Sequence, residues 1–446
     1  MKQKIFFLFT CILFSFFSFA QEGKKMMKVE DMQADIDFFY EKLLSTHPYP
    51  FIILSQDEWK EKIDSLKTSI TQPLTKKDFY FKISELNSYL DLHTSIHPSK
   101  KAYKKIQRAM NYPIFSQKGD TVYVINENKE ECRLLSVGGN TPKEIERIFF
   151  ERESKVEPMY NPTFLNMLRS YCKYNFVEDS IAYTYISSTG KETTSYLCRE
   201  KKSKSASKKN KNNTGTALEI DTVSSSALMT VNTFYPKSIS DFRDSISSYI
   251  KKLNEKKVQR LYIDITSNSG GLVNLTGYLA GFFIEKTGQI YAGTWTSKAS
   301  KERDKQRFDF LIRNGELGDY TQRKYTFYAE NSKPKFSGEI FVVQSRNSYS
   351  AAAIYASLMQ YYTKNCTIIG EEGEIKAFYA DPMTLTLPKS KFMVSMSSMF
   401  GRFVGKDKNR GVVPDIPYKI YDPTKHLSLK ELNKIVEENK NNNNKK

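Results

Sequence analysis

Apolar residues recur at helical spacing in three stretches within the first hundred residues. Successive apolar residues lie three or four positions apart, as on one face of an α-helix: Met32, Ile36, Phe39 and Leu43; Trp59, Ile63, Leu66 and Ile70; and Phe79, Ile83, Leu86 and Leu90. Ser55 and Thr75 precede the second and third stretches and are expected to cap those helices. The pattern predicts a helical N-terminal module over residues 28–100.

Short strand patterns replace the helical spacing between residues 110 and 200. They lie at 121–125, 133–137 and 182–186, and helical patterns interrupt them at 143–150 and 164–172. We expect a separate, mixed α/β module here. Residues 201–216 follow it, and because they are rich in Lys, Ser and Asn without apolar anchors, they predict a flexible basic loop.

Strand and helix patterns alternate over residues 217–425. Strands are expected at 227–234, 261–265, 340–343 and 367–369, with helices at 239–253, 273–284 and from 351. Such alternation predicts a largely parallel sheet covered by helices. Ligands of these sheets sit beyond the carboxyl ends of the strands, and both Gly270-Gly271 and Ser350 fall at such ends.

The first twenty residues have the pattern of a secretory signal peptide. Met1-Lys-Gln-Lys4 is basic, residues 5–19 are almost wholly apolar, and Ala20 offers a small residue for cleavage. A membrane-spanning helix needs about 20 apolar residues, and no later run reaches that length. We therefore expect an extracytoplasmic protein, periplasmic or secreted, without a transmembrane segment in the mature chain.

Net charge is +18, but much of the excess lies in two segments. Residues 199–211 hold seven Lys or Arg against one Glu, and a Lys-rich stretch follows Lys434. Such runs are usually solvated, so we expect no nucleic-acid partner and a disordered tail over residues 437–446. The four cysteines after the signal are widely spaced and lack metal-ligand spacing. The sequence is compatible both with a Cys172–Cys198 disulfide and with free buried thiols.

Ser350 is the candidate nucleophile. It separates a buried strand pattern from a helix of strong formers, so it is expected at a helix N-terminus, where unpaired N–H groups and the helix dipole stabilise an oxyanion. A plain helix cap is the alternative interpretation. The glycines at 270 and 271 could bring backbone N–H groups close to the same point.

A serine nucleophile needs a base, and the chain has four histidines. His47 precedes a proline and His426 lies in the terminal segment, so we expect both to be structural or exposed. His93 and His97 follow the third helix in a polar turn. Lys376 is the other candidate, because burial lowers the pKa of a lysine and leaves more of it neutral.

Two hydrolase classes are excluded by missing motifs. The chain has no His-Glu-x-x-His segment of a metalloprotease and no Gly-x-Ser-x-Gly elbow of an α/β-hydrolase.

Four segments, in chain order, resemble the motifs of one family. They are Leu261-Tyr-Ile-Asp-Ile-Thr-Ser-Asn-Ser-Gly-Gly271, Asn347-Ser-Tyr-Ser350-Ala-Ala, Ile368-Ile-Gly-Glu-Glu372 and Gly411-Val-Val-Pro-Asp415. The family is the C-terminal processing, or tail-specific, serine peptidases, which include the tricorn core protease. Asp91-Leu-His93-Thr94 also resembles the Asp-Gly-His-Thr turn that many secreted members carry before the catalytic domain.

The resemblance implies an exported serine endopeptidase that hydrolyses polypeptides without metal or organic cofactor. It implies a crotonase-like α/β catalytic domain over 217–425, a helical N-terminal module and a PDZ-like module within 110–200. Ser350 would attack the carbonyl, and N–H groups of Gly270 or Gly271 and of Ala351 would hold the oxyanion.

The resemblance also suggests the base and its orienting acid. His93 would be the base, as in tricorn-like members, and Lys376 is the alternative of the lysine-dyad branch, one residue from that branch's usual spacing. Asp407 is the nearest carboxylate before Gly411 and would orient the histidine.

The sequence departs from the family motifs in three places. Thr266 stands where Arg is usual, Leu92 replaces the small residue before the histidine, and Gly373-Glu-Ile stands where Thr-Gly-Gly is usual. These departures support a second hypothesis, a catalytically silent exported protein that binds peptides or another ligand through the same cleft. Acyl transfer on thioesters fits poorly with export.

Overall fold

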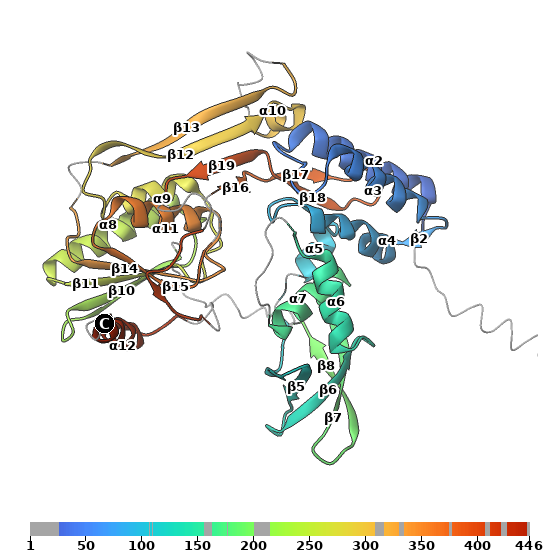
Figure 1. Ribbon diagram of the computed structural model, residues 1–446, viewed down its shortest axis with the longest axis horizontal. Helices are drawn as coiled ribbons and strands as arrows, with labels where there is room; N and C mark the ends of the chain where they lie inside the picture. Colours follow the sequence, from blue (N-terminus) through green and yellow to red (C-terminus); the bar gives the residue numbers. More distant parts are fainter. Residues whose placement is uncertain are drawn as a thin grey trace, which may run out of the picture. The chain divides into compact units, whose positions relative to one another are not determined.

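The computed structural model describes residues 26–443 except 107, 109, 156–162, 176, 200–214, 308–315, 330–333, 374–376, 406–410 and 421–425. It forms two compact units (Figure 1). Unit 1 takes Met1–Lys202, Glu302–Phe308 and Pro382–Ser397, and unit 2 takes Ser203–Lys301, Asp309–Asp381 and Ser398–Lys446. The expected signal peptide and nearly all of the expected basic loop lie outside the described residues.

Unit 1 begins with the expected helices. Its first elements are β1 (Met26–Met27), α2 (Val29–Thr46), α3 (Gln56–Thr68), β2 (Leu74–Thr75), α4 (Lys76–Ile83), the 3-10 helix η1 (Ser84–Tyr89), β3 (Ser95–His97) and α5 (Lys100–Ile106). The predicted caps are confirmed, because Ser55 accepts a hydrogen bond from the N–H of Glu58 and Thr75 from that of Asp78. The apolar faces of α2, α3 and α4 share one core, in which Trp59 and Phe39 are buried.

A late segment of the chain completes this core. It is the hairpin of β17 (Met383–Thr386) and β18 (Met393–Met396), which contributes Leu385, Phe392 and Val394. The short helix α10 (Lys301–Arg307) also lies in unit 1, apart from its first residue. β18 pairs with β17 and with β3, all antiparallel. Asp35, fully buried on α2, accepts the N–H groups of Lys389 and Ser390 at 2.8 and 2.7 Å. No local pattern in the sequence indicates this pairing.

The middle module is a five-stranded antiparallel sheet in the order β4-β5-β6-β7-β8. Its elements are β4 (Phe115–Lys118), β5 (Thr121–Ile125), β6 (Glu131–Val137), α6 (Pro142–Arg152), α7 (Phe164–Tyr174), β7 (Ser180–Ile186) and β8 (Glu192–Cys198). The strands and helices predicted here are confirmed. Both α6 and α7 contribute to the core beneath the sheet. Cys172 is buried and Cys198 exposed, and both are free thiols.

Unit 2 contains the predicted parallel sheet, in the order β20-β15-β14-β11-β10-β9. Its strands are β9 (Thr216–Asp221), β10 (Ser226–Val231), β11 (Arg260–Asp264), β14 (Glu339–Gln344), β15 (Cys366–Gly370) and β20 (Ile416–Pro417). All neighbours are parallel except β9, which is antiparallel to β10.

Helices cover both faces of this sheet (Figure 1). α8 (Ile239–Glu255), α9 (Val273–Ala280) and α11 (Ala351–Tyr362) pack on one face, and α12 (Leu429–Asn443) packs on the other. A second, antiparallel sheet has the order β13-β12-β19-β16, with β12 (Gly288–Lys298), β13 (Tyr320–Ala329), β16 (Ala377–Ala380) and β19 (Met399–Phe403). The mixed α/β class expected from the sequence is therefore confirmed.

The C-terminal end differs from the expected disordered tail. α12 continues to Asn443, and residues 444–446 lie outside the described part of the chain. The helix is held because Leu429, Leu432 and Val436 are buried against the sheet. Polar residues on the same helix also contact the strands.

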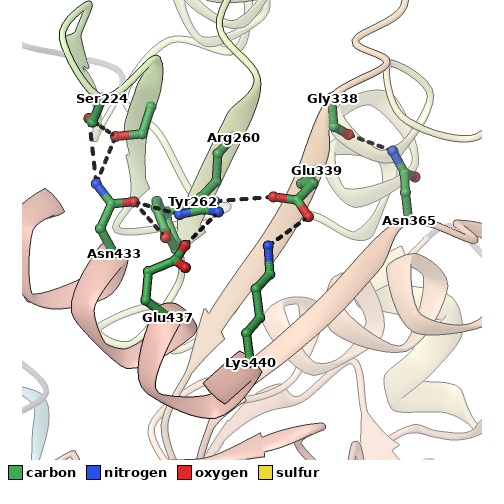
Figure 2. Close-up of polar contacts among 10 residues, drawn as sticks. Ser224, Arg260, Tyr262, Gly338, Glu339, Asn365, Asn433, Glu437 and Lys440 are labelled. Atoms are coloured by element: carbon green, nitrogen blue, oxygen red, sulfur yellow. Dashed lines mark hydrogen bonds and ion pairs between the residues drawn. The ribbon is translucent and has the colours of Figure 1, made fainter. Parts of the chain in front are cut away.

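Figure 2 shows these polar contacts of α12 with the strands. Asn433 accepts a hydrogen bond from the Tyr262 hydroxyl at 2.9 Å, and Glu437 pairs with Arg260 at 2.9 Å. Lys440 pairs with Glu339 at 3.3 Å. The Asn- and Lys-rich composition predicted disorder, but these contacts hold the segment against β11 and β14.

We expect the Leu432→Ala substitution to lower the free energy of unfolding by roughly 2–5 kcal/mol, because Leu432 is fully buried and its loss leaves a cavity. Urea denaturation measures the change. Lys430→Ala on the exposed side of α12 is the control and should stay within about 0.5 kcal/mol of the native chain. Equal stability of both variants would contradict the docking of α12.

Among the residues described, no helix combines the length and hydrophobicity that a bilayer crossing requires.

Candidate active site

Two loops of unit 2 leave the same edge of the parallel sheet. One follows β11 and leads to α9, and the other follows β14 and leads to α11. Because β11 and β14 are parallel neighbours, with Asp264 opposite Val343, their carboxyl ends meet at one edge. This edge is where the sequence predicts a ligand.

Ser350 has a backbone conformation that residues with a side chain rarely adopt, with φ 54° and ψ −119°. It occupies the N-cap position of α11, yet its side chain makes no capping hydrogen bond. The plain-cap interpretation is therefore wrong. A serine in a strained strand-to-helix turn is the arrangement that presents a nucleophilic hydroxyl in other hydrolases.

Gly270 packs directly against Ser350. A Cβ atom at position 270 would lie 2.8 Å from Cβ of Ser350 and 3.1 Å from the nitrogen of Ala351. Its φ of 107° also disfavours any residue other than glycine. The glycine loop therefore touches the serine at the first turn of α11.

Asn268 fixes the glycine loop and was missed by the sequence analysis. Its side chain is fully buried, accepts the N–H of Gly270 at 2.9 Å and donates to the carbonyl of Val231 at 2.9 Å. Its own carbonyl accepts the N–H of Tyr349 at 3.1 Å. An Asn two positions before a Gly is a signal for such a turn.

Of the two glycines, Gly271 is the better candidate for an oxyanion donor. The N–H of Gly270 is committed to Asn268. Gly271 approaches Phe234, where a Cβ would lie 2.2 Å from the Phe234 carbonyl carbon. Phe234 forms an isolated parallel β-bridge here: its N–H donates to the Gly270 carbonyl, and its carbonyl accepts the N–H of Leu272. The N–H of Gly271 takes no part in this bridge.

Buried hydroxyl groups join the two loops. Ser345 Oγ donates to the Thr266 carbonyl at 2.7 Å, and Ser348 Oγ donates to the Ile265 carbonyl at 2.8 Å. Thr266, which stands where the family usually has Arg, donates its N–H and hydroxyl to Asp264 Oδ1. The N–H and the hydroxyl of Thr266 are thus both bonded to the Asp264 carboxylate within this turn.

His426 has a structural partner, as expected. Its Nδ1 lies 2.8 Å from Oδ2 of the fully buried Asp264. This hydrogen bond raises the pKa of His426, against the opposing effect of burial.

His93 lies in unit 1, in the turn between η1 and β3. Its N–H donates to Asp91 Oδ1 at 2.9 Å, and its carbonyl accepts from Ser395 Oγ at 2.7 Å. Burial lowers the pKa of the His93 imidazole, and the charge of Asp91 offsets part of that effect. The side chain is therefore neutral at pH 7, as a general base must be.

His97 has other contacts. Its Nε2 lies 2.7 Å from Ser95 Oγ and its ring packs edge-on against Tyr103. Burial, with the nearby charge of Lys173, lowers the pKa of His97 to about 3. We therefore assign His97 a structural role.

The structure brings Ser350, Ala351, Gly270 and Gly271 together in unit 2. Lys376 and Asp407 lie outside the described residues. Within the described ranges, no cluster of three or more His, Cys, Asp or Glu side chains could hold a metal ion.

Comparison with known proteins finds one family match. Residues 225–418, of 446, match the model of peptidase family S41. No curated protein matches the sequence.

Two solved structures of CPAF have a related fold at low sequence identity. Mature CPAF has a TM-score of 0.57 at 10% identity, covering 87% of this chain and 92% of that chain. A point mutant of CPAF has a TM-score of 0.61 at 11% identity, covering 87% and 93%. The photosystem II D1 C-terminal processing protease has a TM-score of 0.45 at 14% identity, covering 90% and 95%.

The region that matches the family model contains both glycines, Ser350 and Ala351. It also contains β11 and β14, the strands that precede these two loops. Over residues 225–418 the chain therefore matches peptidase family S41, and this match supports a serine-type peptidase.

Proposed function

We propose that the chain is an exported serine endopeptidase in which Ser350 is the nucleophile and His93 the general base. One observation carries the proposal: Ser350 is held in a strained turn at the start of α11, against Gly270, within the region that matches the family. The first twenty residues support export. On this basis the protein is periplasmic or secreted.

The reaction would proceed in two stages. The Ser350 hydroxyl attacks the peptide carbonyl while His93 takes its proton, and the imidazolium then protonates the leaving amine. Water hydrolyses the resulting acyl-enzyme, again with His93 as base. Asp407 is the proposed acid that orients His93, and Lys376 is the alternative base.

Two N–H groups would hold the oxyanion of the tetrahedral intermediate. The N–H of Ala351 begins α11, where the helix dipole favours negative charge. The N–H of Gly271 follows the turn that Asn268 locks in place. Removing one such donor typically costs about 100- to 1,000-fold in kcat.

Two finer features of the fold belong to the same proposal. The parallel strands with helices on both faces support a crotonase-like core. The five-stranded sheet with α6 and α7 supports a PDZ-like module in unit 1.

The second candidate is a catalytically silent peptide-binding protein. Thr266 favours it, because its side chain bonds Asp264 where the family usually presents an Arg. The two candidates differ in whether the Ser350 hydroxyl is activated.

Fluorophosphonate labelling of the purified chain, residues 21–446, tests the proposal. We expect one covalent adduct per chain, found by peptide mapping on the segment that contains Ser350, because an activated serine attacks the phosphorus. The urea-unfolded chain is the control and should not react. A folded chain that stays unlabelled would favour the silent binding protein.

A further inference from the structure

Asp91 lies two residues before the proposed base and is almost completely buried. Its Oδ1 accepts the N–H groups of His93 and Thr94 at 2.9 and 3.1 Å. The Thr94 N–H also bonds the Asp91 carbonyl at 3.1 Å, which closes a tight turn. Aspartate often makes such a turn on its own, so these contacts alone carry no function.

Two further partners of Asp91 come from distant parts of the chain. Ser397, which follows β18, donates its hydroxyl to Oδ1 at 2.8 Å. His47, which follows α2, places Nε2 at 2.9 Å from Oδ2. Asp91 and His47 are each about 1% exposed. Neither partner is needed to close the turn.

A buried carboxylate is costly unless hydrogen bonds satisfy it. Burial acts to raise the pKa of Asp91, but the hydrogen bond and charge of His47, with the Thr94 contact, more than offset it and hold this pKa below its usual value. Asp91 is therefore ionised at neutral pH.

Both backbone groups of His93 are held by side chains. Asp91 holds its N–H, and Ser395, on β18, holds its carbonyl. Leu92, between Asp91 and His93, is 51% exposed and adds little packing to the turn. The backbone of His93 is thus held on both sides by polar contacts.

From these contacts we infer that Asp91 and its buried partner His47 are positioning residues that set the direction in which the His93 imidazole leaves the backbone. The inference rests on the proposed role of His93 as base. Asp91 holds the backbone of His93, and His47 holds Asp91. Both act through the backbone of His93 and neither is a catalytic residue.

Asp35 provides a matched control. It is also a fully buried carboxylate of unit 1 that accepts two backbone N–H groups, but those belong to Lys389 and Ser390, in the turn between β17 and β18. Asp35→Ala should therefore cost stability of the same kind while leaving the hydrogen bonds of Asp91 and Ser395 to His93 in place.

The kinetic experiment compares Asp91→Ala, His47→Phe and Asp35→Ala in the full chain, with thermal unfolding measured for each. We expect Asp91→Ala and His47→Phe to lower kcat by roughly 10- to 100-fold with KM nearly unchanged, as expected of a displaced base. Asp35→Ala should keep its kcat. Asp91→Asn and His47→Gln should restore most of the activity, since an amide oxygen still accepts the N–H of His93 and Gln still offers an N–H to Asp91.

A second readout does not need activity. The chain has four histidines, so the His93 ring resonance can be assigned by NMR from its absence in His93→Ala. Titrated in the Ser350→Ala background, it should shift in Asp91→Ala and remain in place in Asp35→Ala. In Asp91→Asn the pKa of His93 should fall, because the negative charge that favours the imidazolium is gone.

The outcomes separate the two proposals. Equal loss of kcat in Asp91→Ala and Asp35→Ala, with an unchanged His93 resonance, would overturn the positioning role. A native chain that hydrolyses no peptide, but whose His93 resonance responds to Asp91 and not to Asp35, would overturn the proposed function and leave the positioning role standing.

Discussion

Ser350→Ala is expected to reduce peptide hydrolysis by roughly a million-fold while the chain stays folded, since loss of a serine nucleophile alone removes nearly all the rate supplied by its catalytic group. Alanine keeps the Cβ atom that packs against Gly270 and accepts no new strain. Steady-state kinetics on an unstructured polypeptide measures the change. Ser267→Ala, which removes the hydroxyl bonded to Asn232, is the control and should retain activity.

The same position offers a stability test. Ser350→Gly should be more stable than Ser350→Ala by about 1 kcal/mol, because glycine adopts a positive φ without the strain that any side chain incurs. Urea denaturation of the two inactive variants gives the difference. Greater stability of the alanine variant would show that position 350 stores no strain.

His93→Ala is expected to lower kcat/KM by roughly ten-thousand-fold or more, because without a base the Ser350 hydroxyl is a weak nucleophile. Lys376→Ala should largely retain activity. His97→Ala is a second control, since His97 bonds Ser95 and packs on Tyr103. The reverse result, with activity lost in Lys376→Ala and kept in His93→Ala, would assign the base to the lysine.

The pH profile of the native chain tests the same assignment. A histidine base works when neutral, and burial places the pKa of His93 below its ordinary value of 6.5. The value of kcat/KM should therefore rise with pH through a midpoint below 6.5 and be level near pH 7. A rise only in the alkaline range would indicate a lysine.

Secondary structure was predictable from the sequence because its signals are local. The period of apolar residues located α2, α3, α4 and α8, and the cap residues Ser55 and Thr75 have the partners expected of them. The resemblance to family motifs located Ser350 and the glycines. These positions depend on short segments in which each residue lies near its partner in sequence.

The contacts that were not predicted join residues far apart in sequence. His47 meets Asp91 across 44 positions, and Ser397 meets Asp91 across 306. A lone buried histidine leaves no periodic signal, and a four-residue strand such as β18 could pair with many edges. Composition also misled at α12, where a few apolar residues facing the sheet outweigh many polar ones.

During synthesis, the His93 turn of unit 1 can form all its contacts only after the β17–β18 hairpin has been made. Ser395 follows His93 by 302 positions. A ribosome adding about 5–20 residues per second needs roughly 15 to 60 seconds to make that stretch. During this interval the three N-terminal helices exist without β17 and β18, and the His93 turn lacks Ser395 and Ser397. Until Ser397 has been made, the His93 turn of a nascent chain therefore lacks these contacts, and the geometry proposed for the base is completed only near the end of synthesis.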